Sequence, residues 1–217
     1  MKDYKLLIFD MDGTILDTLT DLSNSVNYML KKLDHPTRTT SEIRSFLGDG
    51  VYALVERALP NGLSKEEVDA AYEIMRDYYE VHCADETAPY EGIVELLHSV
   101  KKFGYKLAVV SNKDDYAVVD LCKKHFDGVF DVIIGMNPNR MKKPHPQTVY
   151  ETLDTLNVEK RDAVYIGDTE VDFNTGNNAG LDVIIVSWGF RDYEQMKNYN
   201  MKYYVNTVEE LRKLLVK

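Results

Sequence analysis

Residues 6–14 read LLIFDMDGT, four apolar residues that run directly into two aspartates, Asp10 and Asp12. An apolar run of this length predicts a strand that is buried on both faces. Two carboxylates about 4 Å apart repel each other by about 4 kcal/mol at an effective dielectric constant of about 20. A fold that places them together therefore needs a positive group beside them. The stretch predicts a buried strand that ends at a site for a cation.

Four further apolar runs, rich in Ile and Val, predict strands of the same kind at 106–110, 129–135, 163–167 and 182–187. Helical patterns separate them, as in residues 90–104, where Ile93, Leu96, Leu97 and Val100 share one face. Alternation of strand and helix implies right-handed crossovers and a parallel sheet. The fold class predicted is α/β, with a doubly wound parallel sheet.

Residues from about 18 to 86 contain no strand-like run and read as successive amphipathic helices. Leu22, Val26 and Met29 mark the first, and Ser64 with Glu67 forms a capping box at the start of the last. We therefore expect a core domain of residues 1–16 and 88–217 and an inserted α-helical domain of residues 17–87. The connections near 16–18 and 87–90 are the expected hinges.

The formal net charge of −10 argues against a protein that binds nucleic acid or an anionic membrane surface. The sequence has no apolar run long enough to span a bilayer and no signal-peptide pattern, so we expect a cytoplasmic protein. Cys83 and Cys122 lie far apart without metal-ligand spacing, which predicts two reduced thiols. Small molecules or proteins are the expected partners, and the chain could be a monomer or a homodimer.

Polar residues follow several of the predicted strands, and the carboxyl ends of parallel strands meet at one edge of a sheet. These residues are Asp10 and Asp12, Ser111 and Asn112, Lys143, and Asp168 with Asp172. Each group alone fits a turn, a helix cap or a solvated loop. Four carboxylates in one site, however, require protons or a cation, and oxygen ligands favour Mg²⁺. Beside such a metal, Ser111, the amides near Asn112 and the Lys143 ammonium form an anion cradle, which predicts phosphate chemistry.

Other readings of the same motifs fail on spacing. A calcium-binding EF-hand loop that began at Asp10 would need glycine at its sixth position and glutamate at its twelfth, where Ile15 and Asp21 stand. Neither a Gly-Lys-Ser/Thr phosphate loop nor a dinucleotide-binding glycine pattern occurs. Ser111 lacks the glycine-flanked elbow of a hydrolase nucleophile.

The motifs DMDGT (10–14), VVSNK (109–113), KKPHP (142–146) and GDTEVD (167–172) resemble those of the haloacid dehalogenase superfamily, in the family's order. The helical insert is similar to the family's small α-helical cap on a Rossmann-like core. FLGDGVYALVERALP (46–60), PYEGI (89–93) and VSWGF (186–190) resemble the phosphoglycolate phosphatase subgroup more narrowly. FNTGNNAG (173–180) departs from that subgroup's alanine-rich pattern, which we interpret as altered helix packing.

The resemblance implies a Mg²⁺-dependent phosphomonoester hydrolase that works through an aspartyl-phosphate. Asp10 would be the nucleophile and Asp12 the general acid and base. The metal would be held by Asp10, the backbone carbonyl of Asp12 and Asp168, with Asp172 either a ligand or a support. Phosphate oxygens would contact Thr14, Ser111, Asn112 and Lys143.

In the cap, Gly48, Asp49 and Gly50 resemble the family's substrate-specificity loop. Arg44 and Arg57 are candidates to pair with a substrate carboxylate, or are solvated helix residues. The implied partner is a small phosphorylated metabolite. A pyrophosphatase, another sugar-phosphate phosphatase and a β-phosphoglucomutase remain alternatives, and a non-catalytic binding module is disfavoured because both Asp10 and Asp12 are present.

Overall fold

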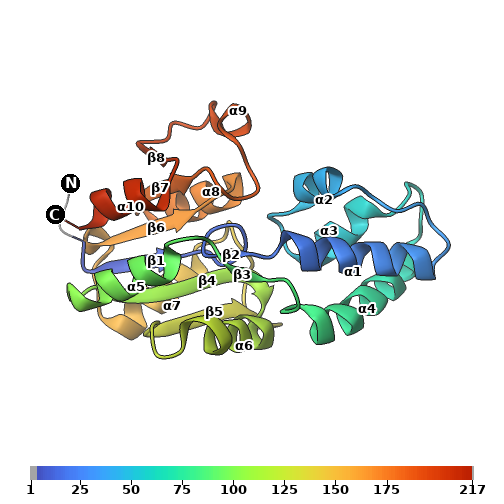
Figure 1. The fold of residues 1–217 in the computed structure, drawn as a ribbon, viewed down its shortest axis with the longest axis horizontal. Helices are drawn as coiled ribbons and strands as arrows, with labels where there is room; N and C mark the ends of the chain where they lie inside the picture. Colours follow the sequence, from blue (N-terminus) through green and yellow to red (C-terminus); the bar gives the residue numbers. More distant parts are fainter. Residues whose placement is uncertain (1–3, 217) are drawn as a thin grey trace. The chain divides into compact units, whose positions relative to one another are not determined.

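The computed structural model describes residues 4–216, which form an α/β unit and a helical unit (Figure 1). The chain divides into Met1–Leu16 with Pro89–Lys217 and, between them in sequence, Asp17–Ala88. The second boundary lies one residue beyond the expected one. Two short strands, β2 (Leu16–Asp17) and β3 (Ala88–Pro89), pair with each other where the chain passes between the units.

The α/β unit is built on a six-stranded sheet of order β5-β4-β1-β6-β7-β8, in which every neighbouring pair is parallel. Its strands are β1 (Leu6–Phe9), β4 (Lys106–Asp114), β5 (Val132–Met136), β6 (Ala163–Gly167), β7 (Asp182–Val186) and β8 (Tyr203–Val205). The predicted doubly wound parallel sheet is confirmed. Its central strand is β1, the strand that leads into Asp10.

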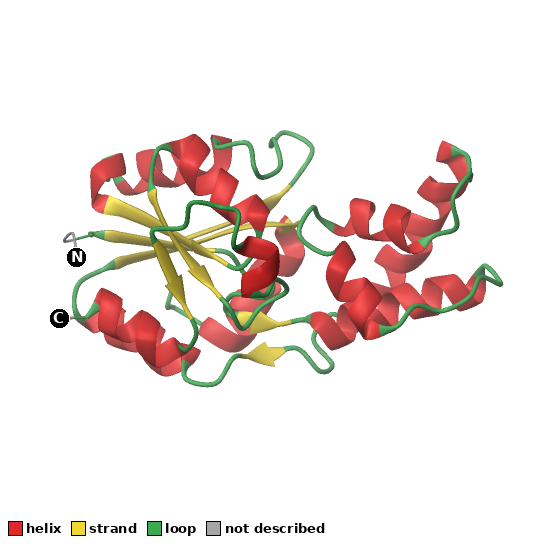
Figure 2. Ribbon diagram, turned by 90° about the horizontal axis from the view of Figure 1, so that it is seen from above, coloured by secondary structure: helices red, strands yellow, loops and turns green. Residues whose placement is uncertain are grey.

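Both faces of this sheet are buried, as the continuous apolar runs predict. Leu6 and Ile8 belong to a core cluster with Val149 and Leu153 of helix α7. Leu7 alternates with them along β1 and is also fully buried. Figure 2 shows helices above and below the strands.

Seven helices belong to the α/β unit within the described residues. They are α5 (Ile93–Lys102), α6 (Asp115–Phe126), α7 (Gln147–Leu156), the 3₁₀ helix η1 (Lys160–Asp162), α8 (Glu170–Ala179), α9 (Tyr193–Met196) and α10 (Val208–Leu215). Thr169 and Asp172 form a capping box at the start of α8. This cap fixes the first turn of the helix that follows β6, and so fixes the GDTEVD motif.

The helical unit contains α1 (Leu19–Lys32), α2 (Thr40–Phe46), α3 (Val51–Ala58) and α4 (Lys65–His82). Ser64 and Glu67 form the predicted capping box of α4, and Met75 and Tyr79 are buried on its inner face. Asp21, in the first turn of α1, is buried and accepts hydrogen bonds from the backbone nitrogen and the hydroxyl of Thr87 at 2.8 and 2.7 Å. The start of the unit is thereby tied to its end.

Two strand predictions were incomplete. The strand expected at 106–110 continues to Asp114 through a register shift between Val110 and Asp114, so Ser111 and Asn112 lie within β4. The edge strand β8 was not predicted, because it is short and only Val205 in it is buried. Cys83 and Cys122 are both free thiols. No helix within residues 4–216 is both long and apolar enough to cross a membrane.

Candidate active site

Asp10 lies at the carboxyl end of the central strand and is 7% exposed. Its backbone nitrogen donates to the carbonyl of Ile166 in β6, so the hydrogen bonding of the sheet continues for one residue past β1. This places the Asp10 side chain at the edge of the sheet. Its Oδ1 atom lies 2.8 Å from Nζ of Lys143, yet that buried oxygen has no partner in hydrogen-bond geometry among the described residues. Asp10 therefore carries an oxygen that is paired in charge but not saturated by hydrogen bonds.

Lys143 reaches the site from the loop between β5 and α7 and is almost fully buried. Its Nζ lies 2.7 Å from Oδ1 of Asp172 as well as 2.8 Å from Asp10. It also donates to the hydroxyl of Tyr165 at 3.1 Å, and that hydroxyl donates to the Val110 carbonyl at 3.1 Å. The Lys143 ammonium thus lies between two carboxylates, and the hydroxyl of Tyr165 in β6 helps to hold it there.

Asp168 and Asp172 follow β6 and are both fully buried. Asp168 accepts from the hydroxyl of Thr14 at 3.0 Å and from the backbone nitrogen of Phe190 at 2.7 Å. Asp172 Oδ2 accepts from the backbone nitrogen of Thr169 at 3.0 Å and from its hydroxyl at 2.8 Å. Both carboxylates are therefore fixed by the loops around them before any ligand arrives.

Burial and the negative charges nearby oppose ionisation of Asp10 and Asp168. Burial and the neighbouring Asp172 charge raise the pKa of Asp10 to about 7, although Lys143 opposes the rise. Burial, Asp172 and Asp10 raise the pKa of Asp168 well above its usual range. Burial would lower the pKa of Lys143, but the charges of Asp10 and Asp172 raise it well above its usual value. The lysine is a permanent cation, and the acids around it need more positive charge.

The residues present fit a divalent metal ion. One carboxylate oxygen from each of Asp10, Asp168 and Asp172 lies within 4.8 Å of the others. All are hard oxygen donors, and one of the three residues, Asp10, carries a buried oxygen without a hydrogen-bond partner. Lys143 alone cannot neutralise three carboxylates. The donor chemistry and the charge deficit both match Mg²⁺.

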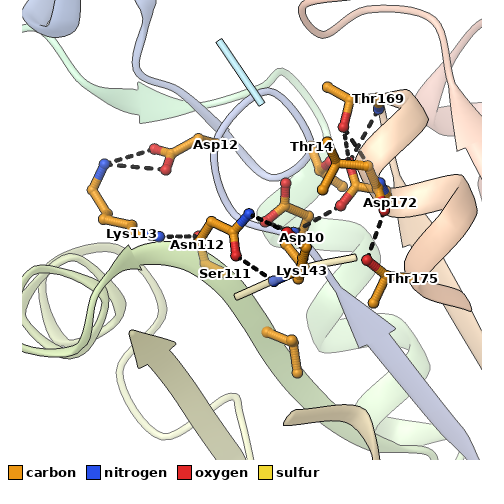
Figure 3. A network of polar contacts seen from close by, with 12 residues as sticks. Asp10, Asp12, Thr14, Ser111, Asn112, Lys113, Lys143, Thr169, Asp172 and Thr175 are labelled. Atoms are coloured by element: carbon orange, nitrogen blue, oxygen red, sulfur yellow. Dashed lines mark hydrogen bonds and ion pairs between the residues drawn. The ribbon is translucent and has the colours of Figure 1, made fainter. Parts of the chain in front are cut away.

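Asp12 occupies a different part of the site. Its side chain is directed away from Asp10 and pairs with Lys113, whose Nζ lies 2.9 Å from Oδ1 and 3.1 Å from Oδ2 (Figure 3). Lys113 was not predicted as a site residue, although it ends the VVSNK motif. Its place in the site could not be predicted, because Lys113 lies in the irregular segment of β4, where the register shifts between Val110 and Asp114.

The predicted phosphate-binding residues have several roles in this arrangement. Asn112 binds the backbone of Lys143, because its Oδ1 accepts from the Lys143 nitrogen at 2.7 Å and its Nδ2 donates to the Lys143 carbonyl at 3.2 Å (Figure 3). Ser111 Oγ accepts from the backbone nitrogen of Lys113 at 3.2 Å. The Thr14 hydroxyl is engaged by Asp168. Asn112 and Thr14 thus orient Lys143 and Asp168.

The residues predicted to read the substrate lie in the helical unit. Gly48, Asp49 and Gly50 connect α2 and α3, and Arg57 of α3 forms an ion pair with Asp49. Arg57 also donates to the Phe46 carbonyl at 2.6 Å. The arginine therefore contacts both the end of α2 and the loop that follows it. Arg44 is half-buried in α2. The expectation that either arginine binds a substrate carboxylate stays a prediction.

The chain is similar to named proteins and to solved structures over most of its length. Residues 7–186 match the haloacid dehalogenase-like hydrolase family. A phosphoglycolate phosphatase of Aquifex aeolicus is 34% identical over 191 residues, 86% of each chain, and one of Psychrobacter arcticus is 32% identical over 206 residues, 91% of this chain and 90% of the relative.

Solved structures agree with these relatives. A crystal structure provisionally named as a phosphoglycolate phosphatase, from Lactobacillus delbrueckii subsp. bulgaricus, has a TM-score of 0.93 at 35% identity and covers 99% of both chains. A haloacid dehalogenase-like hydrolase from Streptococcus pneumoniae has a TM-score of 0.89 at 26% identity, also over 99% of both chains. The predicted resemblance and the predicted enzyme class, a phosphatase, are confirmed. The chain belongs to the haloacid dehalogenase-like hydrolase family.

Proposed function

We propose that this protein is a Mg²⁺-dependent phosphatase of small phosphate monoesters, with 2-phosphoglycolate as the first substrate to test. The observation that carries the proposal is the buried Asp10, with one oxygen unsaturated, between the Lys143 ammonium and two fixed carboxylates. Among enzymes that act on phosphate esters, a carboxylate in such a setting is suited to attack phosphorus. The names of the similar proteins favour phosphoglycolate among the monoesters.

The chemistry takes place in two displacements. In the first, an Asp10 oxygen forms a bond to phosphorus, the bond from phosphorus to the ester oxygen breaks, and Asp12 gives that oxygen a proton. In the second, Asp12 removes a proton from water, the water oxygen bonds to phosphorus, and the Asp10 carboxylate leaves. Inorganic phosphate and an alcohol are the products, and Asp10 and Asp12 return to their starting states.

Each fixed group has a role in these displacements. Lys143 offsets the negative charge on the equatorial phosphate oxygens and opposes the rise that burial causes in the pKa of Asp10. Asp10, Asp168, Asp172 and the backbone carbonyl of Asp12 are the candidate metal ligands. When bound there, Mg²⁺ supplies Lewis-acid stabilisation of the transferring phosphoryl group and allows a dianionic substrate to approach an anionic nucleophile. Asn112 and Thr14 hold Lys143 and Asp168 in position.

The proposal is tested by phosphate release from a panel of 2-phosphoglycolate, pyrophosphate, β-glucose 1-phosphate and an aryl phosphate, with and without Mg²⁺. We expect release that depends on Mg²⁺, is highest for 2-phosphoglycolate and is lost in Asp10→Asn. A preference for pyrophosphate would overturn the monoester assignment. Isomerisation of β-glucose 1-phosphate without release would identify a mutase, and no turnover of any compound would contradict the proposed activity.

A further inference from the structure

Lys113 is a buried cation for which the two displacements above supply no role. Its side chain is 3% exposed and that of Asp12 is 18% exposed, so their ion pair is far less solvated than an ordinary surface pair. Both Asp12 oxygens lie within 3.1 Å of the one ammonium nitrogen. Such a two-point contact restricts the carboxylate to one orientation.

That orientation matters because Asp10 attacks phosphorus, whereas Asp12 gives a proton to the oxygen that leaves. An in-line displacement places the nucleophile and the leaving group on opposite sides of phosphorus. Figure 3 shows Asp12 and Lys113 to one side of Asp10, and Asp172 with Thr169 to the other. The ammonium of Lys113 thus holds the Asp12 carboxylate apart from the nucleophile side chain, as an acid that serves the leaving oxygen requires.

The backbone around Lys113 is shaped for this contact. The irregularity in β4 lies between Val110 and Asp114, where the register against β5 shifts. Irregularities of this kind re-aim side chains beside active sites. The Ser111 hydroxyl accepts from the Lys113 nitrogen at 3.2 Å and fixes the bend. The strand is thus distorted at the point where it supplies the partner of Asp12.

On this geometry, and resting on the proposed function, we propose that Lys113 is a positioning residue for Asp12, which it holds on the leaving-group side for proton transfer. Lys113 makes no bond to the reacting atoms. Its removal leaves phosphorus attack possible but misplaces the acid. The loss is therefore largest for esters whose leaving oxygen needs a proton, and smallest for esters with a stable leaving anion.

The test compares kcat/KM of Lys113→Met for ethyl phosphate and for nitrophenyl phosphate. This constant reports only the steps up to formation of the aspartyl-phosphate, in which Asp12 acts as the acid. Neither ester carries a second anionic group. We expect kcat/KM to fall about 100-fold for ethyl phosphate. For nitrophenyl phosphate we expect it to fall by no more than about 10-fold. Nitrophenyl phosphate turnover also reports that the variant folds. Lys113→Arg keeps the charge and should recover most of the ethyl phosphate activity.

Two controls separate this role from a structural one. Lys101→Met removes a lysine from a half-exposed ion pair with Asp131 in the same unit, and should change neither rate. In an Asp12→Asn background, Lys113→Met should cost little more, because its effect passes through Asp12.

Equal losses for both esters, or a full further loss in the Asp12→Asn background, would overturn the positioning role. So would a loss confined to 2-phosphoglycolate, which would mean that Lys113 binds the substrate carboxylate. If the wild-type protein hydrolyses none of these esters, the proposed function itself fails, and the Lys113 role fails with it.

Discussion

Lys143 is the countercharge for two buried carboxylates, Asp10 and Asp172, at 2.8 and 2.7 Å. Lys143→Met should lower the free energy of unfolding of the metal-free protein by about 3–5 kcal/mol, because it leaves both charges unpaired. It should also lower kcat/KM at least about 100-fold, since the transferring group loses its nearest protein cation. Urea denaturation and steady-state kinetics measure the two effects.

The neighbouring Lys142 is exposed, so Lys142→Met is the matched control and should change stability by less than about 0.5 kcal/mol. If Lys143→Met were as stable and as active as Lys142→Met, the ion pairs of the site would have no energetic role.

Gly13 shows how closely the backbone approaches Asp168, a candidate metal ligand. Its φ is +82°, and an added Cβ would lie 2.4 Å from Oδ2 of Asp168. Gly13→Ala should therefore displace Asp168 and weaken Mg²⁺ binding, in addition to about 1–2 kcal/mol of backbone strain. Gly104 has a φ of +88° with nothing within 4 Å of its added Cβ, so Gly104→Ala carries the strain alone. Mg²⁺ titration by calorimetry would contradict this account if both variants bound the ion as the wild type does.

In the helical unit, Asp21 links the first helix to the last residues of the unit by hydrogen bonds, in addition to apolar packing. This carboxylate on α1 accepts from the backbone nitrogens of Thr87 and Glu86, which precede β3. Asp21→Ala leaves these donors without their charged acceptor and should lower the free energy of unfolding by about 2–3 kcal/mol. Asp77→Ala, in which an exposed carboxylate is removed from α4, should cost less than about 0.5 kcal/mol. Equal costs in chemical denaturation would contradict the closing role of Asp21.

The core strands could be predicted because a strand that is buried on both faces has a continuous run of apolar residues. β8 could not, since an edge strand of three residues needs only one buried side chain, Val205. The extension of β4 was also hidden, because Ser111, Asn112 and Lys113 are polar residues that favour a loop in isolation. They stay in the strand because neighbours in the sheet and in the site bind them.

The meeting of Asp10, Lys143, Asp168 and Asp172 could be predicted from topology, since parallel strands deliver their carboxyl ends to one edge. The pairing of Asp12 with Lys113 could not, because it depends on the irregular register of β4. Nor could the sequence tell that Asn112 would bind the backbone of Lys143, a contact between segments that are 31 residues apart. Local patterns identify which residues reach a site, and packing decides what each one touches.

For the whole molecule, the buried acids make stability depend on pH and on metal. The pKa of Asp10 is raised to about 7 in the folded protein by burial and by Asp172, and that of Asp168 is also raised. Between about pH 4 and pH 7 the folded state keeps a proton that the unfolded state releases, so the stability of the metal-free protein falls as pH rises. A Mg²⁺ ion bound at the acidic cluster would replace that proton.

The increase in Tm caused by Mg²⁺ should therefore grow from about pH 5 to about pH 8, as thermal unfolding at each pH would measure. Asp10→Asn removes one of the two carboxyl groups whose pKa is raised and should flatten the trend. A Mg²⁺ effect on Tm that is constant or declines across this range would contradict the assignment of the ion to the acidic cluster.

On the proposed mechanism Asp10 itself accepts the phosphoryl group, and trapping the phosphorylated residue tests this step. Wild-type protein and Asp12→Asn would be mixed with Mg²⁺ and nitrophenyl phosphate, whose leaving anion needs no proton, then quenched in acid within one turnover, digested and analysed by mass spectrometry. The account predicts an acid-stable, hydroxylamine-sensitive phosphoryl group on Asp10, which accumulates in Asp12→Asn because the water is no longer activated. Phosphate release by the wild type with no phosphorylated Asp10 at any quench time would contradict it.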